Sequence, residues 1–151
     1  MSRKPIRRRR LAAGLAAAAL AAAFGAPAPA AASEFRAALT GANAIPPGDP
    51  DGAGTAKVVV SDVLNEICVE LEVSGLAPAT GAHIHRGAEG ETGPPVVTLD
   101  APDNGDEDDC DAIGDALADE IQANPTGFYI NVHTAEHPEG AIRGQLMPGA
   151  D

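Results

Sequence analysis

The chain has 151 residues, with 22 acidic and 10 basic side chains and a formal net charge of −12 at pH 7. Six of the basic side chains lie in the first ten residues, so residues 33–151 alone carry 4 − 22 = −18. A surface this acidic excludes nucleic acid and anionic lipid as partners, because proteins bind both through basic patches.

Residues 1–32 are typical of a secretory signal peptide. Six basic residues come first, an apolar run of Leu and Ala follows over residues 11–24, and small residues lead to a cleavage site within Ala28–Ser33. The apolar run is short for a membrane span, although an uncleaved anchor is the alternative. Arg9-Arg10 leaves twin-arginine export open beside the general secretory route. The sequence therefore predicts a chain that is secreted or lies in the periplasm or at the cell-envelope exterior, with no membrane attachment after cleavage.

Short strands separated by turn signals make up most of residues 33–151, a length that suits one domain. Alternation is clearest in residues 66–73, where Ile67, Val69 and Leu71 point one way and Cys68 and the glutamates point the other. Residues 41–54 are rich in Pro, Gly and Asp and predict a loop, and residues 62–65 predict a hairpin connection. The predicted strands are residues 35–40, 55–61, 66–73, 81–86, 96–100, 127–134 and 141–147.

Two segments depart from the strand pattern. Residues 103–111 hold six acidic residues among nine, which excludes a buried strand and favours a solvated loop, with a loose calcium site as the alternative. In residues 113–123, Ile113, Leu117 and Ile121 follow helical spacing and predict a short amphipathic helix that ends at Asn124-Pro125. Short strands without a βαβ rhythm indicate an all-β fold, an antiparallel Ig-like β-sandwich or a small barrel.

Cys68 and Cys110 are the only cysteines. An even pair in an oxidising compartment favours a disulfide, and neither cysteine lies beside a histidine or in a C-x-x-C motif. The bridge would close a loop of about 43 residues and stabilise the fold by roughly 4 kcal/mol on the chain-entropy model. Two free thiols or a shared metal are the alternatives.

Three of the four histidines share one face of two predicted strands. Alternation points His83 and His85 the same way, and it places His133 on the polar face of its own strand together with Asn131. Three converging neutral imidazoles with an open position suit one copper or zinc ion. The sequence therefore makes His83, His85 and His133 candidate metal ligands.

Further residues would complete such a site. His137 is a candidate fourth ligand, with water or Glu136 as alternatives, while Asn131 could orient an imidazole and Arg143 could hold an anion.

A purely structural role competes with the metal site. His83 would then bond a carbonyl in residues 87–95, His133 would bond the backbone around Pro138, and Arg143 would pair with an acidic residue. For Arg143 the structural role is favoured over catalysis.

Several phrases, in order and spacing, resemble the CHRD (chordin-type) domain family over residues 35–146. They are Leu39-Thr40-Gly41 with Ile45-Pro46-Pro47, Ala82-His83-Ile84-His85-Arg86-Gly87, Gly93-Pro94-Pro95-Val96-Val97, Tyr129-Ile130-Asn131-Val132-His133-Thr134 and Gly140-Ala141-Ile142-Arg143-Gly144-Gln145-Leu146. The resemblance implies an extracellular β-sandwich spanning residues 33–151, of the kind found in animal regulators of growth-factor signalling and in microbial secreted proteins. The acidic segment around Cys110, with Cys68 on a strand, looks like the version in secreted bacterial members.

A weaker likeness is to the copper/zinc superoxide dismutases, which also carry His-x-His, a later histidine and an arginine on a β-sandwich. His83, His85, His133 and Arg143 follow that order. The stretch between His85 and His133 has no histidines for a bridging ligand or a zinc site, so the likeness implies at most the copper half.

Two functions follow. The first is an extracellular binding or structural module, without enzymatic activity, that holds one metal ion or an extracellular protein partner. The alternative is a copper-dependent, dismutase-like metalloenzyme. The sequence has no nucleophile elbow, Walker loop or dinucleotide fingerprint.

Overall fold

The structure is a computed structural model and describes residues 32–149. Apart from Ala32, the predicted signal peptide lies outside these residues and stays a prediction. Within the described range, no helix has the length and hydrophobicity needed to cross a membrane.

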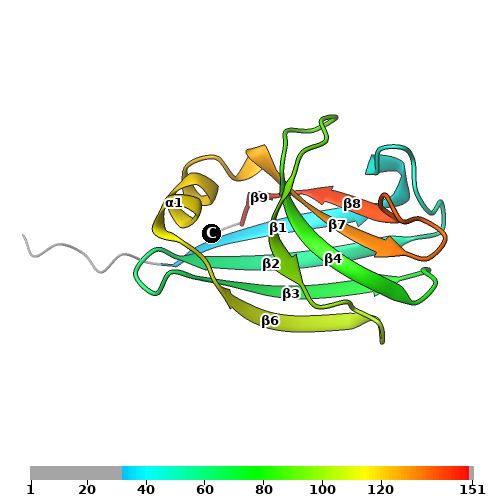
Figure 1. Ribbon diagram of the computed structural model, residues 1–151, viewed down its shortest axis with the longest axis horizontal. Coiled ribbons are helices and arrows are strands. Elements are labelled where there is room, and N and C mark those ends of the chain that lie inside the picture. The colour runs from blue at the N-terminus through cyan, green and yellow to red at the C-terminus, as the bar shows by residue number, and fades with distance from the viewer. Residues whose placement is uncertain (1–31, 150–151) are drawn as a thin grey trace, which may run out of the picture.

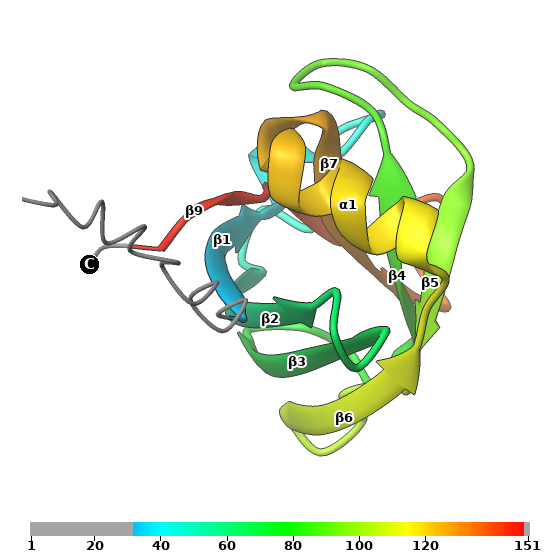
Figure 2. The same cartoon turned by 90° about the vertical axis from the view of Figure 1, so that its left-hand side faces the viewer.

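One antiparallel sheet of nine strands curls over its own core (Figures 1 and 2). The order along the sheet is β5-β4-β7-β8-β1-β2-β3-β6, and β9 pairs with β1. The half formed by β5, β4, β7 and β8 therefore packs against the half formed by β1, β2, β3 and β6, which confirms the predicted antiparallel sandwich. The strands are β1 (Ser33–Thr40), β2 (Ala53–Ser61), β3 (Glu66–Ser74), β4 (Ala79–Arg86), β5 (Pro95–Leu99), β6 (Asp106–Ala112), β7 (Phe128–Thr134), β8 (Ile142–Gln145) and β9 (Met147–Pro148).

The core between the two halves is built from the apolar faces of alternating strands. Ile67, Val69 and Leu71 of β3 are buried as predicted, and Ile84 of β4 faces them from the other half. Full burial of each such side chain contributes roughly 1.5–3 kcal/mol. This packing leaves the opposite face of β4 and β7 for the histidines.

In the described residues one α-helix, α1 (Asp115–Ala123), covers one end of the sandwich (Figure 1). Ala118 and Ile121 are buried in the core, and Ile113 and Leu117 pack against it. The predicted helix is confirmed, with its start two residues later than expected. Two short 3-10 helices, η1 (Gly41–Asn43) and η2 (Pro125–Gly127), complete the regular elements.

The acidic segment is a strand, so the prediction of a solvated loop was wrong. β6 pairs with β3 along its length, although Glu70 lies opposite Asp108 and Glu72 opposite Asp106. An edge strand pairs on one side only, and the side chains of β6 alternate between exposed and half-buried positions, so its carboxylates stay hydrated. The backbone hydrogen bonds between β6 and β3 thus stabilise a strand whose acidic composition a buried strand would not tolerate.

A disulfide joins β6 to β3. Cys68 and Cys110 are directly opposite each other, with a Cα–Cα distance of 4.0 Å, and they form the predicted bond. The bond fastens the strand with the most crowded negative charge to the rest of the sheet.

Charge crowding on β6 predicts a pH-dependent stability. Partial burial, followed by the charges of Asp109 and Asp100, raises the pKa of Asp111. Its charged form therefore costs stability at neutral pH, and protonation removes that cost as the pH falls toward the folded-state pKa. Asp111→Asn is expected to raise the free energy of unfolding at pH 7 by about 0.2–1 kcal/mol, the scale of like-charge pairs across strands.

Chemical unfolding between about pH 7 and pH 4 checks this expectation. The gain from Asp111→Asn should shrink as the pH falls and as salt is added. Asp119→Asn, on the exposed face of α1, is the matched control. Equal stability changes for the two variants at pH 7 would contradict the prediction.

Candidate functional site

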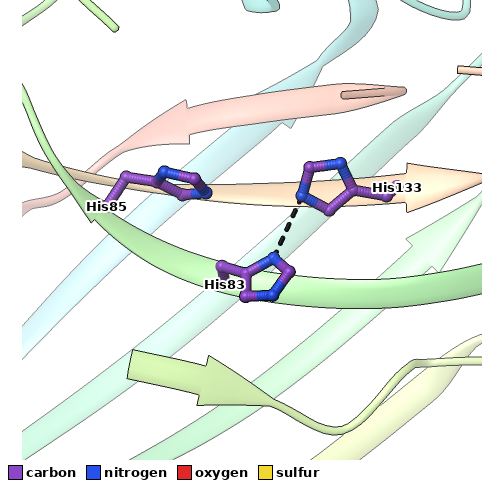
Figure 3. A group of neighbouring side chains, drawn as sticks. All are labelled: His83, His85 and His133. Atoms are coloured by element: carbon purple, nitrogen blue, oxygen red, sulfur yellow. Dashed lines mark hydrogen bonds between the residues drawn. The ribbon is translucent and has the colours of Figure 1, made fainter. Parts of the chain in front are cut away.

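The antiparallel pairing of β4 with β7 brings the three candidate ligands together. Gly81 lies opposite His133, and His83 lies opposite Asn131. The imidazoles of His83, His85 and His133 converge, and one ligand atom from each lies within 4.8 Å of the others (Figure 3). His83 Nδ1 is 3.1 Å from His133 Nε2. The shared face predicted from strand alternation is therefore a real cluster.

Backbone carbonyls determine which nitrogen carries the proton in two of these rings. His85 Nδ1 lies 2.9 Å from Gly93 O, and His133 Nδ1 lies 3.0 Å from Pro138 O. Because a carbonyl oxygen only accepts, both Nδ1 atoms donate, and both Nε2 atoms keep a lone pair in the neutral ring. His83 Nδ1 then donates to His133 Nε2. His85 Nε2 is buried and has no hydrogen-bond partner within the described residues.

Burial favours the neutral forms of His83 and His133. Desolvation, together with the charges of His133 and His85, lowers the pKa of His83. Desolvation also lowers the pKa of His133, despite the opposing hydrogen bond to Pro138 O, and His85 lowers it further. Neutral imidazoles are the form that binds metals.

A loop, residues 87–94, covers the polar face of β7. Arg143 donates from Nη1 to Glu91 O (2.7 Å) and from Nη2 to Ala88 O (2.9 Å). Gln145 Nε2 donates to Gly87 O (2.7 Å), and it also bonds the carbonyls of Thr126 and Phe128. These bonds hold the loop against the sheet, where it covers Tyr129, which is only 3% exposed. Asn131 is 7% exposed and packs against the β7–β8 turn at Gly140.

Tyr129 connects the histidines to Arg143. The ring of His85 stacks on Tyr129 with centroids 4.9 Å apart and planes 7° apart, and the Arg143 guanidinium lies 3.5 Å from the centre of the Tyr129 ring. Because β7 lies between β4 and β8, the Tyr129 ring stands between His85 and Arg143. The stack restricts the orientation of His85 in addition to its bond to Gly93 O.

The hydrogen bonds expected for a purely structural role are partly present. The bond from His133 to the backbone at Pro138 is confirmed, but His85, not His83, bonds the covering loop. Arg143 bonds carbonyl oxygens, and it makes no ion pair with a carboxylate among the described residues. The expected pairing of Arg143 with an acidic residue was therefore wrong.

The remaining sequence candidates lie close to the cluster without joining it. Asn131 donates from Nδ2 to Glu139 O (3.0 Å), so it braces the β7–β8 turn that carries Pro138 instead of touching an imidazole. His137 lies in that turn and is not a member of the cluster among residues 32–149, so its ligand role stays a prediction. Glu66, Cys68 and Cys110 also lie close together, but both sulfur atoms are in the disulfide and supply no thiolate.

The distances suit one metal ion with modest adjustment. Two imidazole nitrogens bound to one ion at about 2.0 Å each are at most about 4 Å apart. The separation of 3.1 Å between His83 and His133 already meets that limit, and the 4.8 Å limit for the whole cluster needs a change of less than about 1 Å.

A match to a protein-family model shows the family of this chain. The model of the CHRD domain matches residues 35–146. The chain belongs to the CHRD domain family. No curated protein and no solved structure matched.

The matched CHRD segment contains every residue of the histidine cluster, the covering loop and its two anchors, Arg143 and Gln145. Sequence reasoning found the histidines of this CHRD domain but missed Tyr129 as their stacking partner and Gln145 as a loop anchor. It also could not identify the Gly93 carbonyl, because every residue carries a carbonyl and only the folded loop brings this one to His85.

The lowered histidine pKa values predict acid sensitivity of the metal-free CHRD domain. A group whose folded-state pKa is below its unfolded-state value stabilises the fold when neutral, and that contribution is lost as the pH falls through the unfolded value of about 6.5. The free energy of unfolding should therefore fall between pH 7 and pH 5. For His83→Gln it should fall less steeply than for the parent protein.

Urea unfolding of chelator-treated protein measures this difference, with His137→Gln as a control outside the cluster. Parallel pH profiles for the parent and His83→Gln would count against the prediction.

Proposed function

We propose that this chain is an extracellular CHRD-type binding module that holds one copper or zinc ion through His83, His85 and His133. His83 would bind through Nδ1, and His85 and His133 would bind through Nε2. The observation that carries the proposal is the pair of Nε2 lone pairs that converge with His83 Nδ1. One of them, that of His85, is buried and has no hydrogen-bond partner among residues 32–149.

Outer hydrogen bonds support the ligand assignment. Metal-binding histidines usually donate the second ring nitrogen to a carbonyl or carboxylate, which fixes the tautomer and orients the ring. Gly93 O and Pro138 O occupy this position for His85 and His133. His83 can release its bond to His133 by moving its proton to Nε2, since either neutral tautomer is available to imidazole.

Long-range charge favours a cation at this site. Residues 33–151 carry a formal charge of 4 − 22 = −18, which raises the local concentration of cations around the domain. Three imidazoles suit copper and zinc, and at equal geometry copper(II) binds more tightly than zinc. A fourth position would be left for water or another ligand.

Extracellular placement is supported by two features. The signal-like residues 1–32 would direct export, and the disulfide between Cys68 and Cys110 suits an oxidising compartment. An extracellular protein partner is compatible with a module of this family.

Metal titration of the exported, mature protein tests the ligand set. Isothermal titration with zinc and with copper(II) should show one ion per chain with sub-micromolar affinity at neutral pH. His83→Ala and His133→Ala should each lower the metal affinity at least about 100-fold. Loss of a residue that only hydrogen-bonds a ligand typically costs roughly 10- to 100-fold. His137→Ala is the matched control and should lose less than either.

Two results would overturn the metal proposal. One is the absence of stoichiometric binding of either ion at neutral pH. The other is a His83→Ala variant that binds like the parent.

Copper loading also separates the module from the dismutase-like alternative. The described part of the chain brings together one histidine cluster, with no second one beside it for a zinc partner. Copper-loaded protein is therefore expected to remove superoxide no faster than copper bound to an unstructured peptide, as measured by pulse radiolysis. A rate well above that reference would favour the enzyme while leaving the metal site intact.

A further inference from the structure

A pocket of about 270 Å³ lies beside the histidine cluster, under the covering loop. Its wall includes His85, Tyr129, Asn131, Glu139 and Arg143. The pocket therefore has one candidate metal ligand, His85, and one guanidinium, that of Arg143, in its wall.

Arg143 gives this pocket a buried positive charge. The residue is 3% exposed, and no carboxylate forms an ion pair with it in the described part of the chain. Its partners, the Glu91 and Ala88 carbonyls, the Gln145 amide oxygen and the Tyr129 ring, are all uncharged. Glu89 acts on Arg143 through its charge, but no carboxylate among the described residues contacts the guanidinium. A desolvated cation without a carboxylate in contact favours an anionic partner.

Hydrogen-bonding capacity remains on this guanidinium. Arg143 has five N–H groups, and the bonds to Glu91, Ala88 and Gln145 use three of them. The Nε–H group is one of the two without an acceptor among residues 32–149. Planar carboxylates match the fork of a guanidinium in both shape and charge.

The charge around the pocket limits which ligand fits. Glu139 is the one carboxylate among the described residues that line it, and its side chain is exposed at the rim. An exposed charge is screened by water, whereas the charge of Arg143 acts inside the pocket. The interior therefore favours a small anion although the protein as a whole is acidic.

We propose that this pocket binds a small carboxylate, with its oxygens on the free N–H groups of Arg143. The site does not require a metal, because Arg143 supplies the charge by itself. An ion held by His85 would add a second positive charge and tighten the binding.

Formate and formamide form a matched pair of probes, similar in shape and different in charge. In ¹⁵N NMR titrations of chelator-treated protein at constant ionic strength, formate should shift the Arg143 Nε–H, Thr92 and Gly93 signals saturably. Formamide should not. Equal responses to the two probes, or a formate response that does not saturate, would overturn the proposal.

Glu139→Gln tests the charge argument without touching Arg143 or the loop. Removing this rim carboxylate should tighten formate binding by about two- to fivefold, as expected for one screened charge several ångströms away. Glu136→Gln is the matched control, an exposed glutamate of the same turn that does not line the pocket. An equal effect of the two variants would count against the site.

A zinc-loaded sample separates this inference from the metal proposal. If zinc binds, formate should bind more tightly than to the metal-free protein. If zinc does not bind, the metal proposal fails, while saturable formate binding to the metal-free protein would still establish the carboxylate site.

Discussion

The register between β4 and β7 is the constraint on which the candidate site depends. It places His83 opposite Asn131 and His133 opposite Gly81, so that the imidazoles meet over the sheet. A slip of one residue would turn every side chain of one strand to the other face, burying His133 in place of Val132. The apolar residues Ile84, Ile130 and Val132 on the inner face prevent that slip. Core packing therefore holds the histidines in position.

Backbone carbonyl oxygens orient two of the imidazole rings. Gly93 O and Pro138 O come from two loops that join different pairs of strands, and each bonds one imidazole. The first loop is held by Arg143 and Gln145, and the second by Asn131 through Glu139 O. The residues expected to assist the histidines directly thus act one step away, through the loops whose carbonyls touch the rings.

Strand alternation and composition predict the sandwich, the helix, the disulfide and the shared face of the histidines. They fail for β6, because six carboxylates among nine residues indicate a loop unless a neighbouring strand and a disulfide are already in place. They also fail for the partner of Arg143, since the carbonyls of Glu91 and Ala88 become available only when the loop folds over β8. Local pattern determines which face a side chain takes, whereas its hydrogen-bond partner is set by contacts distant in sequence.

Opposite charges in this domain act at different depths. The carboxylates of β6 and of the loops are hydrated, so their combined field attracts cations from a distance but is screened at short range. Arg143 is buried, and its charge acts mainly within the pocket that reaches His85. The acidic exterior and the cationic interior are therefore compatible: the first would attract a metal ion toward the histidines, and the second would favour an anion beside it. Because a bound ion and a bound anion would stabilise each other, occupancy of either half of the site should raise the affinity of the other.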